Sequence, residues 1–241
     1  MASFISLLST VLLLSPLCFT TSLVSASNKV SVSLYYEALC PYCSSFIVNN
    51  LANIFQNGLI SIIDLHLVPY GNAMVTSDGS IICQHGTGEC LLNAIEACAI
   101  KVWPDVQQHF PFIQCVEKSV EAREENGWKS CFQATGLSSD PIVNCYNSGY
   151  GQQLEFQYAQ ETNSLQPPHQ FVPWVLVNGK PILEDYENLE HYVCKAYKGA
   201  LPKVCKGQRL TISQETTANN GDKKNMHKPA ICLLSWIILW L

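Results

Sequence analysis

Two cysteines, Cys40 and Cys43, are separated by two residues and directly precede a stretch with helical spacing. At the start of a helix, unpaired backbone N–H groups and the positive end of the helix dipole stabilise a thiolate on the first cysteine. Such a thiolate attacks a disulfide to give a mixed disulfide, which the second cysteine resolves. We therefore expect Cys40 to be the nucleophile and Cys43 the resolving thiol. A first helical turn tolerates Pro41, and Pro41 and Tyr42 are expected to tune the redox potential.

A structural disulfide and half of a zinc site are two other interpretations of this motif. Zinc usually requires a second CxxC or paired histidines at ligand spacing, and the remaining cysteines show neither. The sequence therefore predicts no metal, and it implies no organic cofactor. An inert disulfide in a non-catalytic binding module stays open as an alternative to a redox-active dithiol.

The elements around the dithiol follow a simple order. Residues 29–36 alternate apolar and small polar residues and predict a strand. After the cysteines, apolar residues recur at helical spacing as far as Gly58, which marks a helix end. Residues 59–70 are again strand-like. This order predicts a βαβ unit with a parallel sheet, and the dithiol begins its helix.

A helical insertion is expected to follow, from residue 71 to about residue 166. Strand alternation is absent from this stretch and helical spacing dominates it. Asp140 and Pro141 suit the cap and first turn of one of its helices.

A second unit of two strands and a helix is predicted after the insertion. Strand signals over 171–177 lead to Asn178-Gly179, the strongest short hairpin signal, then to a second short strand and a helix over 184–197. Pro173 stands where thioredoxin-like folds place a cis-proline that faces the dithiol. This resemblance implies a cis Val172–Pro173 bond and assigns both residues to substrate positioning.

A longer motif, CQHGTGECLLNAIEAC over residues 83–98, connects these elements to a known family. Together with CPYC, LVPYGNA over 67–73 and FVPWVLVNG, it closely resembles the gamma-interferon-inducible lysosomal thiol reductase (GILT) family, whose pattern CQHGxxECxxNxxExC is matched at every fixed position. The resemblance implies an α/β, thioredoxin-like fold with a helical, disulfide-rich insertion between an N-terminal βαβ unit and a C-terminal ββα unit. It also implies reduction of protein disulfides in an acidic, proteolytic compartment.

Several polar residues belong to this motif. Glu89, Asn93 and Glu96 are spaced to share one helix face, and we expect them to serve as cap and surface residues rather than as a polar network. His85 has an ordinary pKa near the acidic range, so pH sensing and proton transfer are open roles, but a structural turn residue is the preferred interpretation.

Eight further cysteines are assigned to structural disulfides, because an exported chain with this many cysteines is typically disulfide-bonded. Their pairing is left open, since eight cysteines allow 105 connectivities. They are Cys83, Cys90, Cys98, Cys115, Cys131, Cys145, Cys194 and Cys205.

Both ends of the chain carry targeting signals. Residues 1–26 predict a secretory signal peptide, which leaves 27–210 as the thiol reductase domain. Residues 211–241 are expected to be a flexible tail with an apolar end. Its order of small residues, polar spacer and apolar run predicts a GPI-attachment signal near Asn219 or Asn220, and an apolar tail that packs on the domain or is lost by processing is the alternative. Removal of both ends would also remove Cys18 and Cys232.

The charge pattern narrows the classes of partner. The net charge is -5 and there is no block of Lys and Arg, which argues against nucleic acid. The expected partners are disulfide-containing proteins or peptides and a thiol reductant that the sequence does not identify, with a lipid anchor as a further option. An oxidase or isomerase of the secretory pathway or cell exterior is the alternative within redox chemistry. The chain has no N-glycosylation sequon, so a lysosome or vacuole and the cell exterior both stay open as locations.

Overall fold

The computed structural model describes residues 29–124, 126–206 and 232–233. Its main sheet has four strands in the order β2-β1-β6-β7. The central strand β1 (Val30–Tyr36) pairs in parallel with β2 (Ile63–Pro69) and antiparallel with β6 (Trp174–Val177), which forms a hairpin with β7 (Lys180–Pro181). The βαβ and ββα units thus join along β1, as the sequence predicts.

A helical rod connects β1 to β2 and carries the dithiol at its start. It consists of α1 (Pro41–Ser45), a π-helical segment (Phe46–Leu51) and α2 (Ala52–Gln56). The rod ends at Asn57, and Gly58 follows in the left-handed region with φ 79°. A 3₁₀ turn (Leu59–Ile62) then leads into β2, so the strand begins four residues later than the sequence predicts.

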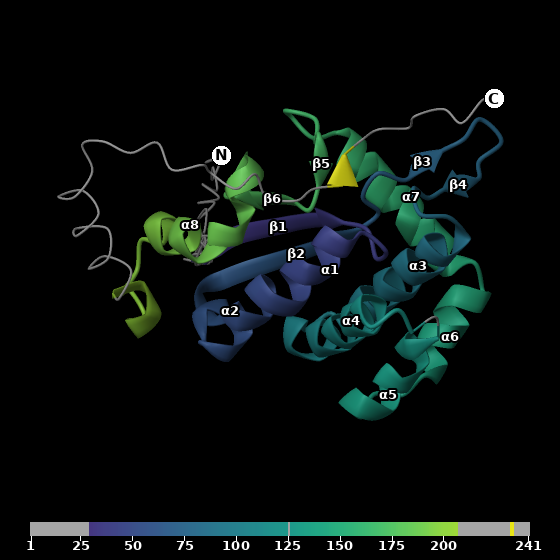
Figure 1. The fold of residues 1–241 in the computed structure, drawn as a ribbon, viewed down its shortest axis with the longest axis horizontal. Coiled ribbons are helices and arrows are strands. Elements are labelled where there is room, and N and C mark those ends of the chain that lie inside the picture. The colour runs from purple at the N-terminus through teal and green to yellow at the C-terminus, as the bar shows by residue number, and fades with distance from the viewer. Residues whose placement is uncertain (1–28, 125, 207–231, 234–241) are drawn as a thin grey trace, which may run out of the picture.

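Five helices form the insertion, and they cluster beyond the end of the sheet that carries the dithiol (Figure 1). The helix α4 packs against α1, and α3 packs against β2, α6 and α7. Asp105 caps α4 by accepting a hydrogen bond from the Gln107 amide. The helices are α3 (Thr87–Val102), α4 (Val106–Glu121), α5 (Ser130–Thr135), α6 (Asp140–Asn147) and α7 (Tyr150–Asn163).

One part of the insertion is not helical, contrary to the prediction. A short hairpin of β3 (Met74–Val75) and β4 (Ile81–Ile82) precedes α3. Its turn is closed by Thr76, whose backbone N–H donates to the Ser80 carbonyl oxygen at 2.9 Å. Strands of two residues are too short to show alternation in the sequence.

The C-terminal unit begins with β5 (Phe171–Val172), directly before Pro173 and β6. After β7, a 3₁₀ segment (Leu183–Asn188) leads into α8 (Leu189–Ala196), which packs against β6. A last described strand, β8 (Cys232–Leu233), lies beside β5 as the yellow arrow in Figure 1.

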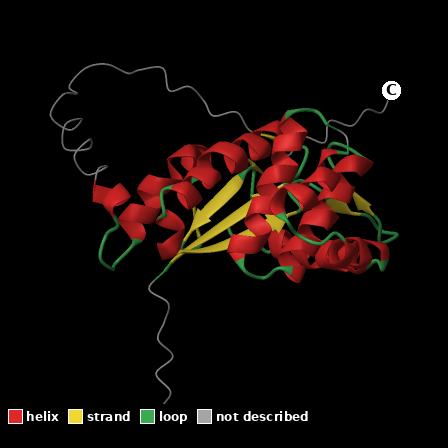
Figure 2. Cartoon of the chain, turned by 90° about the horizontal axis from the view of Figure 1, so that it is seen from below, coloured by secondary structure: helices red, strands yellow, loops and turns green. Residues whose placement is uncertain are grey.

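Two apolar cores hold these parts together. The larger surrounds the sheet and includes Leu34, Ile47 and Trp174, each at most 1% exposed. The smaller lies among the insertion helices around Phe112 and Trp128. Figure 2 shows the strands enclosed by helices. None of the helices described is long and apolar enough to cross a membrane. The predicted signal peptide and GPI attachment residues lie outside the described residues.

Candidate active site

Cys40 occupies the N-cap position of α1, with Pro41 in the first helical turn, as the sequence predicts. Cys43 follows nearly one turn later and is fully buried. Tyr42, between them, is 36% exposed. The amide of Ser44 donates to the Cys40 carbonyl oxygen at 3.0 Å, which fixes the first turn directly behind the nucleophile position.

The oxidised partner of Cys40 is Cys232 and not Cys43. The Cys40–Cys232 disulfide joins residues 192 positions apart, whereas Cys43 is a free thiol. The GPI interpretation removes Cys232 with the tail, whereas the alternative of a tail packed on the domain retains it; neither predicts a bond to Cys40. Nothing in the spacing of the motif indicates it, because the two cysteines meet only through the tertiary fold.

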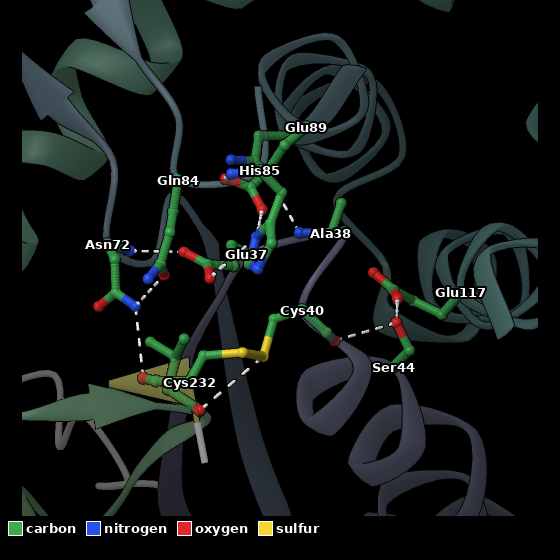
Figure 3. Close-up of a disulfide and its surroundings, with 12 residues drawn as sticks. Glu37, Ala38, Cys40, Ser44, Asn72, Gln84, His85, Glu89, Glu117 and Cys232 are labelled. Carbon is green, nitrogen blue, oxygen red and sulfur yellow. Dashed lines mark hydrogen bonds and ion pairs between the residues drawn. A yellow bond between two sulfur atoms is a disulfide. The ribbon is translucent and has the colours of Figure 1, made fainter. Parts of the chain in front are cut away.

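A short antiparallel pair of strands brings Cys232 to this position. Val172 of β5 stands opposite Cys232 of β8, and the Val172–Pro173 peptide bond is cis, as expected. The Sγ atom of Cys40 lies 4.0 Å from the Val172 carbonyl oxygen. On the other side, Asn72 Nδ2 donates to the Cys232 carbonyl oxygen at 3.4 Å (Figure 3). The cis-proline loop therefore faces the cysteine pair, and an extended strand fits between that loop and Asn72.

A buried carboxyl, that of Glu37, lies beside the disulfide. One of its oxygens is within 4.8 Å of the sulfurs of Cys40 and Cys232. Its Oε2 accepts a hydrogen bond from the backbone N–H of Asn72 at 2.8 Å, while its Oε1 lies 3.5 Å from His85 Nδ1. Gly71 permits this close approach, because a Cβ there would lie 2.5 Å from Glu37 Oε2.

The motif residues His85 and Glu89 extend this cluster toward solvent. His85 Nδ1 is 2.5 Å from Glu89 Oε2, and the His85 amide donates to Glu89 Oε1. The His85 side chain is 34% exposed, whereas Glu89 is buried (Figure 3). The hydrogen bond from His85 to Glu89 raises the pKa of the imidazole. His85 is thus more than a turn residue, since it links two buried carboxyls to the surface.

Burial controls the protonation of Glu37 and Cys43. Loss of water raises the pKa of Glu37 to about 7, and the charge of Glu89 acts in the same direction. Burial also raises the pKa of the Cys43 thiol well above its ordinary value, with the charge of Glu37 as the next largest cause. A proton on Glu37 removes a negative charge from the neighbourhood of both thiols.

A second pair of buried carboxyls lies behind the active-site helix. Glu96 of α3 accepts a hydrogen bond from the Tyr36 hydroxyl at 2.5 Å, and Glu117 of α4 accepts one from the Ser44 hydroxyl at 2.5 Å. Burial raises the pKa of Glu96 to about 8 and that of Glu117 well above its ordinary value. The two carboxyls interact directly, so they are held with at least one proton at neutral pH.

The expected surface role of the motif residues is therefore wrong. Glu89, Asn93 and Glu96 are all fully buried. Asn93 accepts a hydrogen bond from the Ala38 amide at 3.0 Å, two residues before Cys40. Helical spacing correctly predicts that the three side chains share one face of the helix, but it does not tell whether that face is buried. The loop that follows β1 and the insertion helices bury it.

A metal ion has one candidate set of ligands among the described residues outside the disulfide. Oxygens of Glu37 and Glu89 and a nitrogen of His85 lie within 4.8 Å of one another. The hydrogen bond between His85 and Glu89 accounts for this proximity without an ion.

A cavity of about 980 Å³ lies between the active-site loop and the insertion. Its wall includes Leu39 and Pro41, which flank Cys40, and Leu91 and Leu92 from α3. Its polar and charged lining residues are Ser44, His85, Glu121, Arg123 and Glu124, so the cavity is of mixed polarity.

The eight other cysteines form four disulfides among themselves. Three lie in the insertion, and one joins α8 to the segment that follows it. They are Cys83–Cys90, Cys98–Cys145, Cys115–Cys131 and Cys194–Cys205.

Comparisons with known proteins identify the family of this chain. The family model described as gamma interferon inducible lysosomal thiol reductase matches residues 31–135. The chain is 45% identical over 195 residues to a gamma-interferon-responsive lysosomal thiol protein of Arabidopsis thaliana, covering 78% of this chain and 81% of the relative. It is 40% identical to the gamma-interferon-inducible lysosomal thiol reductase of Mus musculus, covering 74% and 73%.

Solved structures show the same fold at low identity. Oxidised BdbD from Bacillus subtilis aligns with a TM-score of 0.54 at 16% identity, over 73% of this chain and 90% of that one. Reduced DsbG from Mycobacterium tuberculosis aligns with a TM-score of 0.53 at 15% identity, over 76% and 85%. These matches confirm the thioredoxin-like fold with its helical insertion. With the extent of the sequence matches, they lead to one conclusion: the chain is a thiol–disulfide oxidoreductase and belongs to the gamma-interferon-inducible lysosomal thiol reductase family.

Proposed function

We propose that Cys40 and Cys43 reduce disulfide bonds in proteins and peptides, with Cys40 as nucleophile and Cys43 as resolving thiol. One observation carries the proposal: Cys40 is disulfide-bonded to a cysteine on an extended strand, and Cys43 lies as a free thiol within the next helical turn. This is the arrangement of a mixed disulfide before its resolution.

The reaction needs no metal or organic cofactor. The Cys40 thiolate attacks one sulfur of the substrate disulfide, and the other sulfur leaves as a thiolate that takes a proton. Cys43 then attacks Cys40 Sγ, which releases the second substrate thiol and leaves a Cys40–Cys43 disulfide. Two equivalents of a small thiol restore the dithiol and become a disulfide themselves.

The cis-proline loop and Asn72 are proposed to position the substrate strand. Val172 offers backbone hydrogen-bonding groups beside Cys40, and Pro173 has no N–H that could compete for them. Pro41 and Tyr42 are proposed to tune the redox potential, which sets whether the dithiol reduces or oxidises its partner.

Protonation of Glu37 is proposed to suit the site to acidic conditions. Below its pKa of about 7, the carboxyl is neutral and no longer opposes a thiolate on the neighbouring cysteines. The helix N-terminus stabilises that thiolate at the same time. The Arabidopsis thaliana and Mus musculus relatives are both named as lysosomal proteins, which supports a secretory route that ends in a lysosome or vacuole.

A lipid anchor is proposed as the alternative fate of the C-terminus, with GPI attachment near Asn219 or Asn220 and export to the cell surface. Mass spectrometry of the C-terminal peptide from the native protein tests this. An ethanolamine-linked terminus at these residues would support it, and an intact terminus at Leu241 would contradict it.

The roles of the two active-site cysteines are tested in a chain that carries Cys232→Ser, so that Cys232 cannot occupy Cys40. Reduction of an unfolded, disulfide-bonded protein by free cysteine is followed at pH 5. Cys40→Ser should lower the rate by at least about 1,000-fold, since the attacking thiol is lost. Cys43→Ser should accumulate a mixed disulfide between Cys40 and the substrate.

The matched control replaces Cys194 and Cys205 by serine, which removes two cysteines that are bonded to each other and not to Cys40, and it should preserve turnover. Equal rates for Cys40→Ser and its parent would refute the nucleophile role. Faster oxidation of a reduced substrate than reduction of an oxidised one, at the same thiol potential, would instead favour the oxidase or isomerase reading.

A further inference from the structure

The contact between Cys232 and the active site consists of more than one bond. The strand β8 (Cys232–Leu233) pairs antiparallel with β5, with Leu233 opposite Phe171 and Cys232 opposite Val172. Asn72 donates to the Cys232 carbonyl oxygen, and the Cys232 side chain is 92% removed from solvent, at 8% exposure. Backbone pairing, a side-chain hydrogen bond and a disulfide thus engage the same segment.

These contacts are those that an extended substrate would make. Strand addition at a sheet edge recognises a peptide through its backbone, and so it accepts many sequences with a cysteine at the reacting position. Within the residues described, β8 is the partner of β5, so the strand edge next to the cis-proline is occupied by the chain itself.

We propose that residues 232–233 are an internal substrate, which docks on the edge of β5 and on Asn72 and holds Cys40 in an intramolecular mixed disulfide. The enzyme is latent in this form, because both the nucleophile and the strand-binding edge are occupied. This inference rests on the proposed function, since it gives Cys40 the role of nucleophile and Cys43 that of resolving thiol.

The exchange conserves the number of disulfides and needs no external oxidant. A Cys232 thiolate attacks Cys40 Sγ of the Cys40–Cys43 disulfide, the bond between Cys40 and Cys43 breaks, and the Cys43 sulfur leaves and takes a proton. The reverse step, attack of Cys43 on Cys40 Sγ, releases Cys232 as a thiol. The oxidised chain therefore has two isomers, one closed on Cys43 and one closed on Cys232.

The balance between the two isomers depends on whether Cys232 is still covalently part of the same chain as Cys40. As long as the chain is intact, released Cys232 attacks again in a first-order step with a high effective concentration. Cleavage between residues 206 and 232 removes this high effective concentration, because the peptide that carries Cys232 diffuses away once exchange has released it. Cleavage alone does not open the site, since the disulfide still holds the segment; exchange by Cys43 or an external thiol must follow.

The isomers can be distinguished in the unmodified full-length chain. The protein is oxidised without added thiol, quenched with acid, alkylated under denaturing conditions and mapped without reduction. We expect a peptide in which Cys40 is linked to Cys232 and an alkylated Cys43. The Cys194–Cys205 linkage serves as the internal control for scrambling. Recovery of Cys40 only in linkage with Cys43, with that control intact, would overturn the proposal.

Rates provide the second measurement. With a small amount of free cysteine as reductant, the full chain should show a lag before it reduces its substrate, and Cys232→Ser should show an initial rate about tenfold higher. After complete reduction the two chains should react at similar rates. Similar initial rates without a lag would contradict latency, whereas loss of turnover in the fully reduced chains would contradict the proposed function itself.

Discussion

The sheet and the helical insertion bury different kinds of side chain. All four residues of β6 are buried and apolar, and the core around the sheet consists of aliphatic and aromatic groups. The insertion helices bury carboxyls in addition to their apolar core, including Glu89 and Glu96 on α3 and Glu117 on α4. The difference indicates that the two regions have different roles. The sheet determines where the two cysteines lie, and the buried carboxyls of the insertion determine how the protonation of the groups around them changes with pH.

The largest effect is expected from the disulfide that crosses the insertion. Replacing Cys98 and Cys145 by alanine releases a loop closed over 47 residues, which should cost roughly 4 kcal/mol of unfolding free energy. The same change at Cys194 and Cys205, separated by 11 residues, should cost roughly 3 kcal/mol. Urea unfolding at pH 5 measures both. A smaller loss for the longer loop would show that chain entropy does not govern these bridges.

The sheet should respond to truncation without regard to pH. Leu34, on the central strand, is 1% exposed, so Leu34→Ala should lower the unfolding free energy by about 2–5 kcal/mol through lost burial and a cavity. The loss should be the same at pH 5 and pH 8, because Leu34 packs in the apolar core around the sheet and its truncation removes no ionisable group. A loss that doubles between the two values would refute the separation of roles.

The insertion should make the protein more stable at pH 5 than at pH 8. The carboxyl of Glu96 has an ordinary pKa of 4.5 when unfolded and about 8 when folded, so between these values the folded state holds the extra proton. Stability therefore falls as pH rises through this window, on the order of 4 kcal/mol for this group. Glu155, with a pKa of about 8, acts in the same direction, and the lowered pKa of His109 opposes it.

The substitution Glu96→Gln tests that slope. The amide of the new side chain can still accept the hydrogen bond from the Tyr36 hydroxyl, and the substitution removes one of the two interacting carboxyls. We expect little change in melting temperature at pH 5 and a higher melting temperature than wild type at pH 8. Glu184→Gln, at an exposed position, is the control. An unchanged slope in Glu96→Gln would place the pH response elsewhere.

The smallest effect is expected where the two regions meet. Glu37→Gln keeps a group that accepts from the Asn72 amide but removes the charge beside Cys43, so the pKa of the Cys43 thiol should fall. In the form closed on Cys232, Cys43 is the free thiol of the described residues, and thiolate absorbance reports its titration. A midpoint equal to that of wild type would exclude Glu37 as a determinant.

Sequence patterns predicted the sheet more completely than the site. Strand alternation, the helix stop at Gly58 and the Asn178-Gly179 turn are local signals, and the structure contains each of these elements. The site depends on contacts between distant segments. Spacing alone does not reveal that Glu37 lies against His85, because those residues are 48 positions apart and meet only after α3 has packed on the sheet.

The described residues contain an odd number of cysteines, and this has one further consequence. Ten of them form five disulfides and Cys43 is left over, so eleven cysteines can never all be paired within one molecule. Every fully oxidised arrangement of these eleven keeps one thiol, and in this structure that thiol, Cys43, stands within a helical turn of a disulfide. Loss of Cys232 would make their number even. A cut in the chain followed by exchange at Cys40 would then change a set of cysteines that always holds one thiol into a set that can be oxidised to completion.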